Sequence, residues 1–137
     1  MPGTLNDSYI AGDHVQSVRC LLNTACIDQA FYIAPCTMTV VRIDYVHGTA
    51  GSDGSAVNLQ VRRCQGTETP TQGDALLTNN SSAGFNCKGT AWTVQNGTLT
   101  TDTSVLTLSA GDRLSLDFAW TVTALVDVTV TVTLQRV

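Results

Sequence analysis

Apolar and polar residues alternate most regularly near the end of the chain. Between positions 113 and 137 the apolar side chains fall mainly on even numbers, with Ser, Thr and Asp between them. These even positions are Leu114, Leu116, Phe118, Trp120, Val122, Val126, Val128, Val130, Val132 and Leu134. A period of two predicts half-buried β-strands. One strand of this length would measure about 80 Å at about 3.3 Å per residue, so we predict two strands and a turn near 123–127, where Leu125 breaks the phase.

Shorter strands are predicted earlier in the chain. Pro35 ends one of them because proline has no N–H for a β-ladder. A phase change at Val40–Val41 indicates a bulge in another, and residues 74–77 fit either a helical turn or a strand. The expected strands are 31–35, 38–47, 57–62, 91–99 with a tight turn at 96–97, and 105–108. Seven to nine short strands at this spacing predict an all-β fold, a small jelly-roll-like β-sandwich.

The chain length fits one domain, since 137 residues match the common size of a single hydrophobic core. The first 28 residues show no sustained period, so we expect residues 1–28 to form an N-terminal arm or loop-rich segment. Short strands at 9–10 and 15–22 remain possible there. Residues 29–137 are expected to form the β-sandwich domain.

Composition supports the β assignment and excludes several partners. Thr and Val are abundant, whereas Glu68 is the only Glu and Lys88 the only Lys. Charged residues make up only 13% of the chain and the net charge is −4, so the basic surface of a nucleic-acid binder is missing. The same charge disfavours anionic membranes. No apolar run or export signal is recognisable, so we expect a chain made in the cytoplasm.

Catalytic and metal-binding motifs are missing. His14 and His47 are the only histidines, and neither belongs to a nucleophile motif. Asp13 and Asp44 near them are best explained as turn or surface residues. A calcium site at Asp53 is conceivable, but the spacing of an EF-hand loop is absent. We expect no enzyme, no catalytic residue, no cofactor and no metal.

Five cysteines give an odd number without a Cys-x-x-Cys pair. We expect free thiols that pack as small apolar groups. A disulfide joining Cys20 to Cys26 or Cys36 is the alternative, and a metal site ranks below both.

The two tryptophans belong to alternating apolar series. This placement predicts core positions for Trp92 and Trp120. The alternative is a solvent-facing surface that stacks on sugars beside polar residues such as Asn80 and Asn96.

Four segments together resemble the capsid decoration, or cement, proteins of tailed phages. They lie within residues 56–134, at 56–64, 89–95, 108–118 and 128–134. The third contains an Ala-Gly-Asp-Arg-Leu turn, and the fourth is the terminal Val/Thr strand. The resemblance implies a small β-sandwich that forms a homotrimer on the outer capsid surface of the virion.

This resemblance implies binding to the major capsid protein and stabilisation of the head. We expect residues 1–29 to face the capsid, because they lack a core pattern of their own. The alternative function is a carbohydrate- or receptor-binding head module of a phage fibre.

Overall fold

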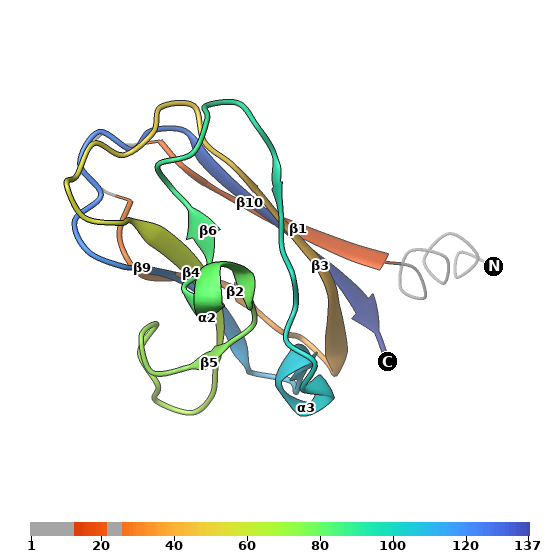
Figure 1. Ribbon diagram of the computed structural model, residues 1–137. Coiled ribbons are helices and arrows are strands. Elements are labelled where there is room, and N and C mark those ends of the chain that lie inside the picture. Colours follow the sequence, from red (N-terminus) through yellow and green to blue (C-terminus); the bar gives the residue numbers. More distant parts are fainter. Residues whose placement is uncertain (1–12, 22–25) are drawn as a thin grey trace.

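The protein is a β-sandwich of two antiparallel sheets (Figure 1). The computed structural model describes residues 13–21 and 26–137, so the predicted arm falls partly outside the described residues. The first sheet contains β1 (Asp13–Cys20), β3 (Met38–Val46), β7 (Gln95–Asn96), β8 (Thr107–Leu108) and β10 (Val128–Arg136). The second contains β2 (Gln29–Ile33), β4 (Asn58–Cys64), β5 (Asp74–Ala75), β6 (Phe85–Asn86) and β9 (Arg113–Phe118). The predicted all-β sandwich is confirmed.

The strand order is that of a jelly roll. The first strand pairs with the last, β1 with β10, and the second pairs with the next to last, β2 with β9. Further in, β3 pairs with β8 and β7, and β4 pairs with β5 and β6. This nesting arises when one long antiparallel hairpin folds over into two facing sheets. It places β1 and β2 at the ends of their sheets.

The core lies between the two sheets and follows the predicted alternation. Val128, Val130, Val132 and Leu134 of β10 are fully buried, and the threonines between them face outward and are half-buried. Across the core, β4 and β9 contribute Leu59, Val61, Leu114 and Leu116, which are also fully buried. Burial of a side chain of this size contributes about 1.5–3 kcal/mol to the free energy of unfolding.

Several local predictions are confirmed, and others are corrected in length. The ladder of β10 with β3 skips Val41, which is the predicted bulge. Residues 119–127 turn the chain between β9 and β10, as Leu125 indicated. Segment 74–77 begins as β5 rather than as a helical turn. The strand expected at 91–99 shrinks to β7, and the one at 105–108 to β8 behind the short helix α3 (Thr103–Leu106).

Part of the predicted arm belongs to the sandwich. Residues 13–20 form β1, which pairs with β10 at all eight positions without a register shift. The boundary expected after residue 28 therefore falls just before β2, between two strands of one sandwich.

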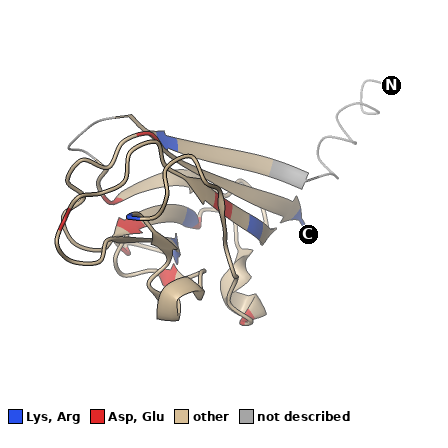
Figure 2. Ribbon diagram, turned by 45° about the horizontal axis from the view of Figure 1, so that its top comes forward, with Lys and Arg blue, Asp and Glu red and all other residues tan. Residues whose placement is uncertain are grey.

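Charged residues are sparse along both sheets, as the blue and red segments of the ribbon in Figure 2 show. Arg62 and Asp117 form an ion pair on the outer face of β4 and β9, with 2.6 Å between Nε and Oδ2. No helix in the described part of the chain is long and apolar enough to span a membrane.

A buried glutamine holds one outer face of the second sheet. Gln60 of β4 is 2% exposed, and its amide nitrogen donates to the carbonyls of Leu77 and Ser82, each at 2.9 Å. Its amide oxygen accepts from the Leu77 N–H, also at 2.9 Å. The side chain thus connects β4 with the segment that contains α2 (Asn79–Ser82).

Gln60→Leu is expected to lower the free energy of unfolding by about 2–4 kcal/mol, because buried backbone groups lose their partners. Urea unfolding measures this loss. Gln135→Leu, at an exposed position of β10, is the matched control and should change stability by less than about 0.5 kcal/mol. Equal effects of the two substitutions would contradict the assigned role of Gln60.

Candidate functional site

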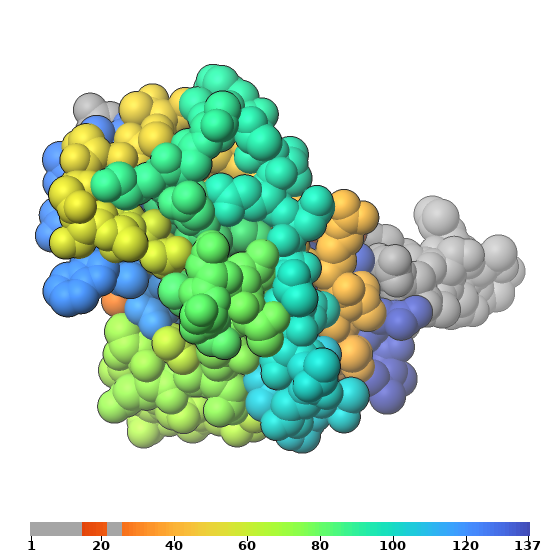
Figure 3. Space-filling view, in the orientation of Figure 1, coloured from red at the N-terminus to blue at the C-terminus, as the bar shows by residue number. Residues whose placement is uncertain are grey.

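Three loops meet at one end of the sandwich, which we call the loop end. It consists of residues 47–57, 87–94 and 119–127, whose surfaces adjoin in Figure 3. Strand register places it: Cys20 pairs with Val128 next to these loops, whereas Asp13 pairs with Gln135 at the opposite end. The start of β1 and the end of β10 therefore lie far from the loop end.

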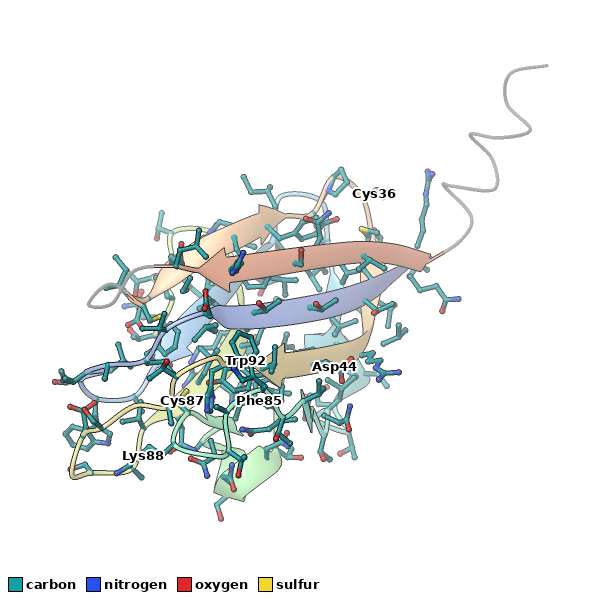
Figure 4. The ribbon with its side chains drawn as sticks, turned by 90° about the horizontal axis from the view of Figure 1, so that it is seen from above. Cys36, Asp44, Phe85, Cys87, Lys88 and Trp92 are labelled. Atoms are coloured by element: carbon teal, nitrogen blue, oxygen red, sulfur yellow. The ribbon has the colours of Figure 1, made fainter. Side chains whose placement is uncertain are left out.

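Hydrogen bonds brace the three loops against one another. The Gly51 N–H donates to the Cys87 carbonyl, and the Ser52 N–H donates to the Thr123 carbonyl, each at 2.9 Å. The Thr123 N–H donates in return to Oδ2 of Asp53 at 2.8 Å. Lys88 Nζ donates to the Asp53 carbonyl, and Figure 4 shows where Lys88 lies on its loop. The loops form one connected platform.

A buried polar chain supports the platform from below. The Gly89 carbonyl can only accept, so the 2.8 Å contact makes His47 Nε2 the donor. His47 Nδ1 then accepts from the Tyr45 hydroxyl at 2.7 Å. Burial raises the pKa of Tyr45, which keeps its hydroxyl protonated as a donor. The ring of Tyr45 also stacks on Phe85, with 5.0 Å between centroids.

Both tryptophans stand in solvent on this platform. Trp120 is 76% exposed and Trp92 is 68% exposed. The backbone N–H of Trp92 donates to the His47 carbonyl at 2.8 Å, and Figure 4 shows the Trp92 side chain near the end of β3. Its ring lies over Gly48, where an added Cβ would come within 2.8 Å of it. Glycine at 48 therefore allows the indole to lie close to the backbone.

The predicted core positions of Trp92 and Trp120 are wrong, and backbone geometry gives the reason. Alternation places a side chain inward only while the chain stays extended. β9 ends at Phe118, and Trp120 has a left-handed backbone with φ of 66°. Trp92 has φ of 58° and lies before β7 begins. A left-handed bulky residue is uncommon, and the sequence carries no glycine-like signal for it.

A groove of about 430 Å³ opens beside Trp120. This volume lies within the range of about 300–1,000 Å³ that is typical of small-molecule sites. Its lining residues are Cys26, Ile27, Asp28, Phe118, Trp120, Thr121, Val122 and Thr123. Trp92 is not among them, so the two exposed indoles have different surroundings.

Among the described residues that line the groove, Asp28 is the only one with a charged side chain. Its Oδ1 accepts from the Phe118 N–H at 2.7 Å, which fixes the carboxylate. Burial raises the pKa of Asp28, opposed by the Phe118 hydrogen bond. No other described residue forms a hydrogen bond with its second oxygen, Oδ2.

The other candidate residues take up structural contacts or lie outside the description. Asp44 forms an ion pair with Arg42, with 2.6 Å between Oδ2 and Nε, and accepts from Asn96 at 2.8 Å. The side chains of Asp13 and His14 are not described. Asn80 donates to the Gly84 carbonyl at 2.7 Å, and neither Asn80 nor Asn96 lines the groove.

A calcium site at Asp53 was conceivable from the sequence, but the described residues around Asp53 include no set of metal ligands. Nowhere in residues 15–21 and 26–137 do three His, Cys, Asp or Glu side chains gather as they would around a metal ion. The Asp53 carboxylate instead faces the Thr123 amide.

All five cysteines are free thiols in the structure. Cys20, Cys26, Cys64 and Cys87 are buried, and Cys36 is half-buried. Cys20 and Cys26 share a hydrogen bond that lowers the pKa of Cys20 and raises that of Cys26. Burial raises the pKa of the Cys87 thiol to about 12. Buried thiols with raised pKa values act as small apolar groups.

Comparison with known protein families, curated proteins and solved structures finds no match to this chain.

The two carboxylates with shifted pKa values predict opposite pH effects. A raised pKa means that the folded chain binds the Asp28 proton more tightly than the unfolded chain does. The bound proton therefore stabilises the fold at low pH, and this stabilisation is lost as pH rises from about 3.9 through the folded pKa. Hydrogen bonds from Ser104 lower the pKa of Asp102, whose contribution is lost as pH falls through its folded pKa.

Asp28→Asn is therefore expected to be more stable than the natural chain near pH 7, and Asp102→Asn less stable. The Asp28 difference should shrink as the pH falls through the raised folded pKa of Asp28, whereas the Asp102 difference persists until the pH falls through the lowered folded pKa of Asp102. Urea unfolding as a function of pH measures both. Differences of the same sign at pH 7 would contradict the assigned environments.

Proposed function

We propose that this chain is a non-catalytic capsid decoration protein of a tailed phage. It binds the major capsid protein on the outer surface of the head as a homotrimer and reinforces the particle. Support comes from the resemblance of residues 56–134 and from the jelly-roll order, an architecture that includes viral capsid and lectin domains. Fold analogy alone does not decide function, so the remaining support comes from the residues exposed on the surface.

The observation that carries the proposal is a set of exposed aliphatic side chains on the edge strands β1 and β2 and beside their connection, which we call the apolar stripe. Val15 of β1 is 59% exposed and Ile33 of β2 is 67% exposed. Leu21 and Ile27, which flank the connection between these strands, are 56% and 60% exposed. Exposed aliphatic side chains grouped on one side of a protein mark an interaction surface.

In the described part of the chain no strand pairs with the outer edge of β1, whose charged residues are Asp13 and Arg19. β1 follows β10 for eight residues without a bulge, and it contains neither Pro nor Lys. Natural proteins commonly shield a regular edge strand with such features, or cover it with a partner. A sister subunit that covers β1 and β2 would bury both the edge and the apolar stripe.

The outer face of the first sheet is also suited to contact with protein. Thr129, Thr131 and Thr133 of β10 face outward, opposite Arg19, Ser17 and Val15 of β1. Arg19 is neutralised by Asp127, with 3.0 Å between Nη2 and Oδ1. A neutral face of short side chains loses little solvation and little side-chain entropy when a partner covers it.

The alternative function is a carbohydrate- or receptor-binding head module of a phage fibre. In that case the end of the sandwich opposite the loop end would attach to a fibre. Exposure of both tryptophans fits this alternative, because tryptophan is enriched at binding surfaces of either kind. The particle to which the chain is attached distinguishes the two functions.

Val15→Asp is expected to weaken self-association at least about tenfold, because a charge enters the apolar stripe. Light scattering after size exclusion should give about 44 kDa for the natural protein, three times the 14.5 kDa chain mass, and a smaller mass for the variant. Thr67→Asp is the matched control, since Thr67 is exposed in the turn between β4 and β5, at the other edge of the second sheet from β2. A natural monomer, or equal loss in both variants, would contradict the proposed edge.

Particle binding tests the function itself. Purified protein should bind phage heads from which it has been removed, and should restore their resistance to heat and osmotic shock. Protein denatured and not refolded serves as the control. Failure to bind such heads, with unchanged head stability in its absence, would overturn the decoration function.

A further inference from the structure

We propose that the groove beside Trp120 is a binding site for a neutral saccharide, holding one or two pyranose rings. The groove shares Ile27 with the exposed apolar residues beside β1 and β2, but its test uses soluble glycosides and measures neither self-association nor particle binding. Its failure and that of the capsid proposal are therefore separate results.

The backbone at Trp120 is strained in order to expose an aromatic ring. A bulky residue with φ of 66° costs on the order of 1–3 kcal/mol in folding. Burial does not offset this strain, because the side chain is 76% exposed. Strain that the packing does not require is typical of recognition sites.

The walls of the groove combine apolar and polar groups. Phe118 and Val122 form an apolar base, at 7% and 8% exposure, and Ile27 forms an exposed apolar rim. Thr121 and Thr123 line the same groove and carry hydroxyl groups. This mixture of an apolar base and a few polar groups is the usual composition of a small-molecule site.

A pyranose ring presents both kinds of surface that this groove offers. Its C–H face packs on an indole ring, as Trp120 would allow. Its hydroxyl groups donate to a carboxylate, and Asp28 lines the groove with its Oδ1 held by the Phe118 N–H. A wholly apolar ligand would instead desolvate the Asp28 carboxylate without giving it a hydrogen bond.

Charge selects among saccharides. Asp28 is the only carboxylate in the described lining of the groove, and the net charge of the chain is −4. An anionic sugar would place a second negative charge beside Asp28, which costs affinity in a partly desolvated site. Neutral hexoses and N-acetylhexosamines avoid this repulsion.

Trp92 provides an internal control. It has the same left-handed backbone and a comparable exposed fraction, but it packs over Gly48 and lines no part of the groove. The two indoles therefore differ in surroundings while they share residue type and exposure.

The experiment records the two indole N–H signals of the ¹⁵N-labelled natural protein during titration with methyl glycosides. The probes are those of glucose, galactose, mannose, N-acetylglucosamine and glucuronic acid. We expect saturable shifts of the Trp120 signal with at least one neutral glycoside, and smaller shifts of Trp92. Trp92→Phe assigns the two signals.

Two variants locate the site. Trp120→Ala and Asp28→Asn are each expected to weaken binding of the neutral glycoside at least tenfold, while Trp92→Ala leaves it within about twofold. Asp28→Asn keeps an acceptor for the Phe118 N–H and should reduce discrimination against the glucuronide. Cooperative unfolding at temperatures no lower than that of the natural protein confirms that the variants fold.

Lack of a saturable shift with every neutral glycoside would overturn the proposal. Tighter binding of the glucuronide than of any neutral glycoside would overturn it as well. Equal loss of binding in Trp92→Ala and Trp120→Ala would also contradict this position of the site.

Discussion

The structure depends on the position of β10 between β1 and β3, with one face in the core. Its inward side chains are fully buried valines and a leucine, and its outward side chains are threonines. A shift of one residue would exchange these two faces and place hydroxyl groups in the core. This register therefore determines where β10 begins, at Val128, and hence where the 119–127 loop must display Trp120.

Outside the core between the sheets, the surface has regions with different roles. Between the sheets, burial stabilises the fold, whereas the β1–β2 edge and the loop end retain apolar side chains in solvent. In a chain with only 13% charged residues, such regions are poorly shielded against association. The proposed partner on the edge and the proposed ligand at the loop end would together cover these side chains.

Much of the fold could be predicted from the sequence, because alternation reports which face of a strand is buried. It located β3, β4, β9 and β10, the bulge at Val41 and the turn at Leu125. It predicted β7 and β8 too long, left β5 open between a strand and a helical turn, and did not locate β6, since two residues show no period. The groove was also missed, because Asp28 and Trp120 are distant in sequence and meet only through the pairing of β2 with β9.

The loops at the loop end hold both indoles in solvent. Quenching of tryptophan fluorescence by acrylamide measures this exposure. Our account predicts that the native protein is quenched nearly as strongly as the unfolded chain, with an emission maximum close to that of indole in water. Emission shifted to shorter wavelength with weak quenching would show buried tryptophans. That result would contradict the loop end as described.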